Sequence, residues 1–170
     1  MVTNLIIRKG MQTDLPALEW DGEYAHYHRL FADAYQQMEQ GRAVIWIAEL
    51  PREGLVGQLF VSLNSYRVEL ADGKTRAYLF GFRVRPAYRS IGIGTAMMHT
   101  VEADLADRGF LQLTLNVGQE NPAARIFYER LGYWVIGPDP GCWSYLDDRG
   151  QRVDVCEPAW RMIKDFCRMR

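Results

Sequence analysis

The segment at residues 84–98, VRPAYRSIGIGTAMM, constrains the fold more than any other part of the chain. A β-branched and aromatic run precedes it, and an apolar stripe at helical spacing follows it. Gly92 and Gly94 therefore sit between a predicted strand and a predicted helix. Because glycine has no Cβ, an anion can approach the backbone and bind the N–H groups that open the helix. The segment predicts either a phosphate-binding turn or a tight strand-to-helix turn that needs glycine for its geometry alone.

Two common phosphate-binding loops do not fit these residues. A P-loop carries a lysine and a hydroxyl directly after its last glycine, whereas Gly94 is followed by Thr95 and Ala96. A dinucleotide-binding loop needs a third glycine three positions after the second, and Met97 occupies that position. What the segment retains is an Arg-x-x-Gly-x-Gly turn that begins at Arg89. Such a turn would hold a pyrophosphate through backbone N–H groups and the positive end of the helix dipole.

The remaining sequence predicts strands and helices in a mixed order. Strands are expected at 4–10, 43–50, 55–63, 76–84 and 111–117. Helices are expected at 14–20, 24–39, 95–108 and 121–131. Asn121 and Pro122 are a typical N-cap and first position for the last of these helices. Short strands separated by turns follow, so the order is typical of a mixed α/β sheet with one strand–helix–strand crossover.

Length and charge narrow the class of protein. No repeat or linker divides the 170 residues, so 1–170 are expected to form a single domain, with a hairpin extension at about 138–156. The net charge of −1 gives no electrostatic reason to expect nucleic acid or an acidic membrane as a partner. No apolar run approaches a membrane span, and the N-terminal residues lack the core of a signal peptide.

The cysteines are Cys142, Cys156 and Cys167, an odd number without Cys-x-x-Cys spacing. This pattern predicts neither a zinc cage nor a disulfide framework. The expected compartment is then the reducing cytoplasm.

The glycine turn resembles the acetyl-CoA-binding motif of the GNAT superfamily of N-acetyltransferases, Arg/Gln-x-x-Gly-x-Gly/Ala, and the similarity extends upstream to V-x-P-x-x-R. NPAARIFYERLGY at 121–133 is similar to a second signature of that family, and IIRKGMQTDLPAL to its first strand and helix. The order of elements matches as far as about Phe166. The resemblance implies an α/β fold with a mixed, mostly antiparallel sheet of about seven strands, about four flanking helices and a central, splayed parallel strand pair.

The resemblance also implies acetyl-CoA as co-substrate, without a metal. Backbone groups of Phe82 and Val84 are expected to pair with the pantetheine arm as an added strand would. Asn121 is expected to contact the pantetheine, and N–H groups of the glycine turn to hold the pyrophosphate. The expected acetyl-CoA contacts are Phe82, Arg83, Val84, Arg89, Ser90, Ile91, Gly92, Ile93, Gly94, Thr95, Asn121, Ala124 and Arg125.

Tyr128 is the candidate catalytic residue by the family pattern. A phenol, with an ordinary pKa of about 10, can donate a proton to a departing thiolate. The alternative is a core aromatic, because Tyr128 shares a helical face with Ala124 and Leu131.

No general base is assigned. Many relatives place a carboxylate on the fourth strand, but the run 76–84 contains no Asp or Glu. Tyr78 on that strand could orient a water, although an aromatic inside a strand usually serves packing. Glu49 on the second strand is no better supported. An ordered water or an already neutral amine is equally admissible.

The acceptor is expected to enter beside the first helices and the last strands. Residues 19–31, EWDGEYAHYHRLF, are aromatic with scattered acids, which suits a cationic amine. Tyr27, Leu30 and Phe31 also fit an ordinary helix core. His26 and His28 cannot share a metal ion, because residues two apart diverge by about 200° on a helix.

The extension at about 138–156 is typical of a hairpin with Trp143 and Tyr145 on one face. It could cover the acceptor site, form the seam of a homodimer or pack on itself.

Together these features predict an N-acetyltransferase that moves the acetyl group of acetyl-CoA to a primary amine of a small molecule or peptide by direct attack. The alternative is a non-catalytic acyl-CoA-binding or sensing module, which the missing strand carboxylate favours and Tyr128 opposes. A nucleotide-binding protein that uses the same glycine turn is a third hypothesis.

Overall fold

The structure is a computed structural model that describes residues 2–166. Within this range, seven strands form one sheet in the order β1-β2-β3-β4-β5-β9-β6, and β7 pairs with β8 as a separate hairpin. Neighbouring strands in the large sheet are antiparallel except for the parallel pair β4 and β5. This is the mixed, mostly antiparallel sheet that the sequence predicts.

The bounds of the elements agree closely with those expected. The strands are β1 (Ile6–Lys9), β2 (Ala43–Leu50), β3 (Gly54–Ser62), β4 (Arg76–Val84), β5 (Gln112–Gly118), β6 (Trp134–Asp139), β7 (Cys142–Leu146), β8 (Arg152–Cys156) and β9 (Ala159–Asp165). The α-helices are α1 (His28–Glu39), α2 (Ile93–Asp107) and α3 (Pro122–Arg130). The 3-10 segments are η1 (Gln12–Gly22), η2 (Ala25–Tyr27) and η3 (Pro86–Tyr88).

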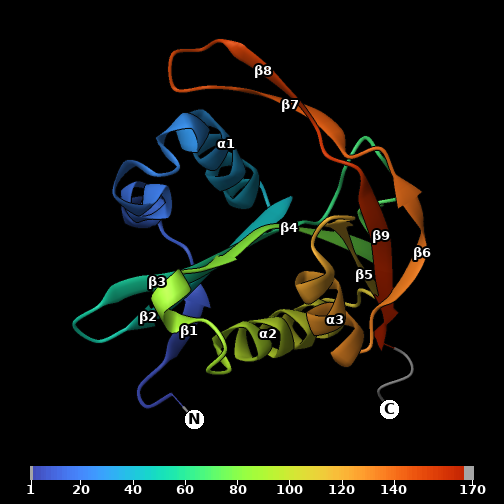
Figure 1. The fold of residues 1–170 in the computed structure, drawn as a ribbon, viewed down its shortest axis with the longest axis horizontal. Helices are drawn as coiled ribbons and strands as arrows, with labels where there is room; N and C mark the ends of the chain where they lie inside the picture. The colour runs from blue at the N-terminus through green and yellow to red at the C-terminus, as the bar shows by residue number, and fades with distance from the viewer. Residues whose placement is uncertain (1, 167–170) are drawn as a thin grey trace.

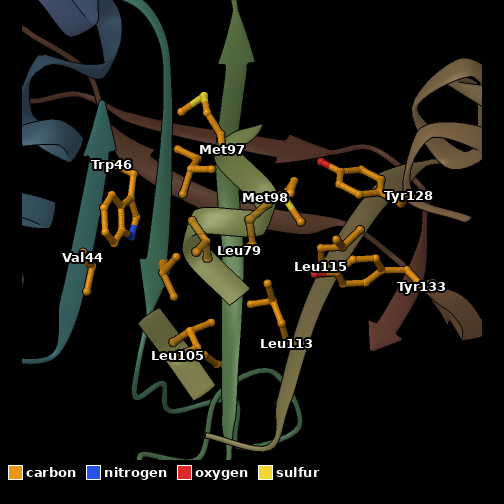
Figure 2. Packing of buried hydrophobic residues seen from close by; sticks show 14 of the residues in the cluster. Val44, Trp46, Leu79, Met97, Met98, Leu105, Leu113, Leu115, Tyr128 and Tyr133 are labelled. Carbon is orange, nitrogen blue, oxygen red and sulfur yellow. The ribbon is translucent and has the colours of Figure 1, made fainter. Parts of the chain in front are cut away.

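Helices cover both faces of the sheet, with α1 and the N-terminal 3-10 segments on one face and α2 and α3 on the other (Figure 1). The predicted apolar stripe of α2 is confirmed. Met97, Met98 and Leu105 are buried against Leu79 of β4 and Leu113 of β5 (Figure 2). On the opposite face, a second cluster joins α1 and η1 to β2 and β3. The two clusters fix β4 between two packed layers.

The parallel pair separates halfway along its length. Pairing between β4 and β5 ends at Leu79 opposite Leu115, although β4 continues to Val84 and β5 to Gly118. Beyond this point β4 remains paired with β3 on one side only. The expected splay is confirmed, and it leaves a free strand edge inside the molecule.

A bulge at Gly81 sets which side chains of β4 face which layer. The register between β3 and β4 shifts here, so that Phe60 is opposite Phe80 while Gln58 is opposite Arg83. Gly81 has a φ of 62°, and a Cβ at this position would lie 2.6 Å from the Phe60 ring. Only glycine fits both the left-handed backbone and the close ring.

The N-terminal helical region differs from the prediction. The helix expected at 24–39 begins as η2 and becomes α-helical only at His28, and the preceding segment is 3-10 with a non-helical kink at Trp20 and Asp21. Trp20 and Asp21 have φ angles of 48° and 57°, which reverse the chain before α1. The buried Trp20 Nε1 donates a hydrogen bond of 2.7 Å to Gln58 Oε1. This tertiary contact holds a backbone conformation that helical spacing does not reveal.

The cysteine prediction is wrong for one pair. Cys142 and Cys156 lie opposite each other in the β7–β8 hairpin and form a disulfide. They are 14 residues apart in sequence, so only the hairpin register brings them together. Cys167 lies outside the described residues. The disulfide removes the reason for expecting a reducing compartment, so the cytoplasmic location stays a prediction without that support. Within 2–166, no helix combines the length and apolar character needed to cross a membrane.

We expect Gly81→Ala to lower the free energy of unfolding by about 2–4 kcal/mol, because it adds left-handed strain to overpacking against buried Phe60. Gly54→Ala is the matched control, since Gly54 has a similar φ of 74° and nothing lies within 4 Å of the point that a Cβ would occupy. That control should lose only about 1 kcal/mol. Chemical denaturation of both variants measures the difference. Equal losses would show that the close approach to Phe60 is unimportant.

Candidate functional site

The glycine turn joins β4 to α2 through η3. Gly92 is the N-cap of α2 with a φ of 94°, and no atom lies within 4 Å of where its side chain would be. A Cβ on Gly94 would lie 3.3 Å from Phe127 and 3.5 Å from Phe82. Gly94 therefore sits in close contact with two rings, whereas Gly92 supplies a left-handed turn with open space above it. The turn has the geometry for which glycine is favoured, and its binding of a phosphate stays a prediction.

The start of α2 presents its backbone N–H groups without competition. No side chain caps this end, and its first turn contains no acidic residue, in the part of the chain that the structure describes. Ser90, with a φ of 63°, also adopts a left-handed conformation. Unpaired N–H groups at a helix N-terminus form a binding site for an anion such as a phosphate.

The free edge of β4 leads from this turn into the molecule. Phe82 and Val84 pack toward the α2–α3 layer, where the ring centre of Phe82 lies 6.2 Å from that of Phe127 on α3. The carbonyl oxygen of Val84 accepts a hydrogen bond of 2.7 Å from Arg89 Nε. Arg89 thus fastens the turn back onto the end of β4. This bond engages one of the backbone groups expected to pair with pantetheine.

Helix α3 borders the splay on the same side. Asn121 Oδ1 accepts a hydrogen bond of 3.1 Å from the Ala124 N–H, so the predicted N-cap is confirmed. The amide group of Asn121 keeps its Nδ2 for other contacts. Arg125 pairs with Glu129 at 2.8 Å, and its guanidinium lies 5.7 Å from the ring of Trp160.

Tyr128 lies on the buried face of α3, 8% exposed. Its hydroxyl points away from α3 toward β4 (Figure 2). Burial raises the pKa of Tyr128 well above that of a free phenol, and nearby Tyr78 raises it further. Among the described residues, the hydroxyl has no hydrogen-bond partner. Tyr128 therefore stays protonated at neutral pH, and its role as a proton donor stays a prediction.

A cavity of about 510 Å³ lies on the other face of the sheet. It is bordered by α1, the β3–β4 loop, the sheet and the base of the β7–β8 hairpin, which arches over α1 (Figure 1). The residues that line it are mostly aromatic or charged and include Tyr27, Phe31, Phe60, Arg67, Tyr78, Phe80, Arg83, Asn116, Asp139, Trp143 and Glu157. The side chain of Arg83 is thus on the cavity side, whereas Phe82 and Val84 point to the α2–α3 side.

Four rings form a continuous stack beneath this cavity, and we call Phe31, Phe60, Phe80 and Tyr78 the aromatic column. Successive ring centres are 5.5, 5.3 and 5.9 Å apart, with interplanar angles of 6°, 20° and 16°. The column runs from α1 across β3 to β4 and ends at Tyr78, one residue before the β4–β5 pairing stops.

The hairpin closes the cavity from above. The predicted placement of Trp143 and Tyr145 on one face is confirmed, because their ring centres are 5.1 Å apart and both rings contact Tyr27. Of these two hairpin residues, Trp143 borders the cavity, whereas Tyr145 does not.

Asp139 anchors the wall opposite α1. Its carboxylate accepts hydrogen bonds of 2.7 Å from both Arg67 and Arg161, and one of 2.9 Å from the Gly141 N–H. Burial alone would raise the pKa of Asp139, but the bonds from Arg161, Arg67 and Gly141 outweigh it and hold the pKa well below its usual range. Arg67 also pairs with Glu69 at 2.8 Å, whereas Arg161 Nε is buried without a hydrogen-bond partner among the described residues.

Asn116 lies on β5 at the first position beyond the pairing with β4. Its Oδ1 is buried and has no hydrogen-bond partner within residues 2–166. Asn116, Asp139 and Glu157 were not among the site residues expected from the sequence. The strict alternation in LQLTLNV could have marked Asn116, since it puts that residue on the same face as Thr114.

The two base candidates lie in different places. Tyr78 lines the cavity, and burial raises its pKa, as does the charge of Asp139. Glu49 is instead held by Arg8 at 3.0 Å, on the β1–β2 side of the sheet, and Arg8 also binds Asp14. Glu49 is therefore committed to another ion pair.

The aromatic residues at 24–31 are divided between the core and the cavity, and their contact with an acceptor stays a prediction. Phe31 is buried in the core, while Tyr27 and Leu30 also line the cavity. His26 stacks on Tyr27 with ring centres 4.1 Å apart, and His28 Nδ1 lies 2.9 Å from Glu19.

Comparison with known proteins finds relatives both by sequence and by fold. The model of the acetyltransferase (GNAT) family matches residues 13–133. An "uncharacterized N-acetyltransferase" of Mycobacterium bovis is 40% identical over 52 residues, which are 31% of this chain and about a third (33%) of that relative's length. The 5-NmdU N-acetyltransferase of Pseudomonas phage PaMx11 is 26% identical over 140 residues, covering 81% of this chain and 92% of that protein.

A solved structure of Arabidopsis thaliana NAA60 in complex with acetyl-CoA superposes with a TM-score of 0.71. The superposition covers 96% of this chain and 99% of the other, at 19% identity. The two chains share a fold.

We expect Asp139→Asn to lower the free energy of unfolding by on the order of 3 kcal/mol at neutral pH, because two arginines lose their common buried carboxylate. The folded pKa of Asp139 lies below the unfolded value of about 3.9. Its ionised form therefore stabilises the fold above that pH, and the stabilisation is lost as the pH falls toward the folded pKa. Denaturation at pH 7 and pH 3 should show the gap between wild type and variant narrowing in acid.

Asp154→Asn is the control for this prediction, because Asp154 pairs with Arg152 and both side chains are 71% exposed. It should leave stability almost unchanged at either pH. A pH-independent gap for Asp139→Asn would refute the electrostatic explanation.

Proposed function

The chain belongs to the GNAT acetyltransferase family, and on this premise we propose that it transfers the acetyl group of acetyl-CoA to a primary amine of a small molecule or peptide. The observation that carries the proposal is the free edge of β4. That edge joins the anion-binding turn at one end to the region between Tyr128 and the cavity at the other. A thioester laid along it would meet a proton donor on one face of the sheet and an acceptor from the other.

The proposed acetyl-CoA contacts are those that the sequence predicts, divided by the structure into three groups. The turn from Arg89 to Thr95 would hold the pyrophosphate, with Gly92 leaving room for it. Phe82 and Val84 would pair with pantetheine along the β4 edge. On the α3 side, the pantetheine arm would be bordered by Asn121, Ala124 and Arg125. Arg83 would contribute backbone only, because its side chain lies against Tyr24 and Tyr27.

In the proposed reaction, the amine nitrogen attacks the thioester carbon directly. A carbon–nitrogen bond forms and the carbon–sulfur bond breaks, so the electron pair of that bond leaves on sulfur. Tyr128 gives its phenolic proton to the thiolate. The proton lost by the amine returns to Tyr128 through solvent, which balances the cycle. General acid catalysis by a positioned side chain typically raises the reaction rate about 10²–10⁴-fold.

The base remains unassigned within the proposal. The strand β4 carries no carboxylate, and Glu49 is held by Arg8. A water beside Tyr78, or an amine that arrives neutral, fits the cavity. The absence of a β4 carboxylate is also the observation that favours the second candidate function, a non-catalytic acyl-CoA-binding or sensing module.

The acceptor panel can be guided by the relatives. One is named for 5-NmdU, so 5-NmdU belongs beside polyamines, amino acids and short peptides in a screen that reads free thiol released from acetyl-CoA. We also propose a cytoplasmic location, which cell fractionation tests. A homodimer is a further proposal, which sedimentation tests.

We expect Tyr128→Phe to lower kcat by about 10²-fold, while the Kd for acetyl-CoA changes less than about twofold, because only the proton donor is removed. Steady-state kinetics and calorimetry measure the two quantities. Tyr133→Phe is a matched control, since its hydroxyl instead donates to the buried Glu102 at 2.8 Å. It should cost stability and leave kcat of the folded enzyme unchanged. Unaltered kcat in Tyr128→Phe would exclude the acid role.

We expect Gly92→Ala to raise the Kd for acetyl-CoA about tenfold, because a side chain strains the left-handed N-cap and enters the space above the turn. Gly109→Ala is the matched control at the other end of α2, with a similar φ of 88° and open surroundings. It should show the same loss of stability with no change in Kd. Equal affinity in both variants would mean that the turn does not bind the cofactor.

A further inference from the structure

The cavity on the α1 face has walls suited to a flat ring. Phe80 and Tyr78 of the aromatic column form its floor, Tyr27 its side and Trp143 its roof. The close packing of Phe60 on Gly81 holds the column in place. Such a site gains from offset or edge-to-face ring contacts that a saturated ligand of equal size does not make.

The charges of the cavity suit an acceptor of low charge, because Arg67 and Arg83 on the lining are matched in number by Asp139 and Glu157. Asp139 is already shared by Arg67 and Arg161. Burial raises the pKa of Tyr27; the charge of Arg83 lowers it, while Tyr145 and Glu157 raise it. Among residues 2–166, neither Arg83 nor Glu157 has an ion-pair partner, so the lining carries one unpaired charge of each sign. A polyamine or a lysine-rich peptide would bring more cations than the site balances, and the arginines on the lining would repel them.

Asn116 supplies a specific acceptor for an N–H group. Its Oδ1 is a buried oxygen without a partner in the described chain, and it lines the cavity where β5 leaves β4. A buried unsatisfied acceptor costs about 1–3 kcal/mol. A ligand N–H at this point would remove that cost.

We propose that the acceptor is a monoamine carried on an aromatic ring, with the ring between the aromatic column and Trp143 and the amine N–H bonded to Asn116 Oδ1. The inference rests on the proposed function and names its substrate class. The amine then lies at the splay, across the sheet from Tyr128. Glu157 favours entry of one cation without binding it in the reactive position.

A panel of amines tests the substrate class. Phenethylamine, its saturated counterpart cyclohexylethylamine, and spermidine are compared as acceptors with the full chain by thiol release from acetyl-CoA. We expect kcat/KM for phenethylamine to exceed that for cyclohexylethylamine about fivefold, as ring–ring contacts imply, and to exceed that for spermidine by more. Trp143→Leu should remove the aromatic preference. Tyr145→Leu is the matched control, because Tyr145 lies beside Trp143 outside the cavity, and it should keep the preference.

Asn116→Leu tests the polar contact. The variant should lower kcat/KM for phenethylamine at least about tenfold, the equivalent of one lost hydrogen bond, and leave acetyl-CoA affinity unchanged. Its thermal stability should be equal or higher, because an unsatisfied buried oxygen is removed. A purely structural role for Asn116 would instead lower stability and spare the activity of the folded enzyme.

The outcomes separate the inference from the proposed function. Better turnover of spermidine or cyclohexylethylamine would overturn the inference and leave the acetyltransferase proposal standing. If calorimetry shows phenethylamine bound with the same dependence on Asn116 but no amine is acetylated, the ligand class holds and the proposed reaction fails. If phenethylamine is neither bound nor acetylated, the inference is overturned.

Discussion

The candidate site depends on the loss of pairing between β4 and β5 after Leu79 and Leu115. A strand edge with free N–H and C=O groups is normally avoided or covered, since it invites pairing with another chain. Here the edge lies between two packed helical layers (Figure 1), so an extended ligand arm can reach it and another sheet cannot. In the proposed function, this one feature of the sheet would provide a place for the cofactor arm next to the cavity proposed for the acceptor.

Different anchors hold the two strands apart. On the β4 side, the Gly81 bulge rotates the strand, Arg83 stacks on Tyr24, and Arg85 lies 5.2 Å from the ring of Trp20. On the β5 side, β5 stays fully paired with β9. There, Asp139 fastens β6, β9 and the β3–β4 loop to one another. Each strand is thus fixed to its own neighbours more firmly than either is to the other. The Asp139 bonds are charge-assisted, which adds to the strength of the anchor on the β5 side.

Local sequence determined much of this arrangement. The strands at 43–50 and 76–84, the α2 stripe and the Asn121 N-cap were predictable because periodicity and capping are properties of neighbouring residues. Three other features were not predictable, because each joins segments that only the folded sheet brings together. They are the kink at Trp20, the Cys142–Cys156 disulfide and the Asp139 cluster. Asn116 is an intermediate case. The face of the sheet on which it lies was predictable from alternation. Its unsatisfied oxygen was not, because it depends on the end of β4–β5 pairing just before this position.

The two interpretations of Tyr128, core aromatic and proton donor, are not exclusive in this structure. Packing against Phe127 and Tyr133 fixes the ring, and the same burial raises the pKa of the hydroxyl. A raised pKa keeps the proton in place at neutral pH, and it also makes the phenol a weaker acid. Transfer to sulfur is then favourable only while the thiolate is forming, when its negative charge is buried beside the hydroxyl. In the proposed reaction, core packing therefore confines proton transfer to the moment of carbon–sulfur cleavage.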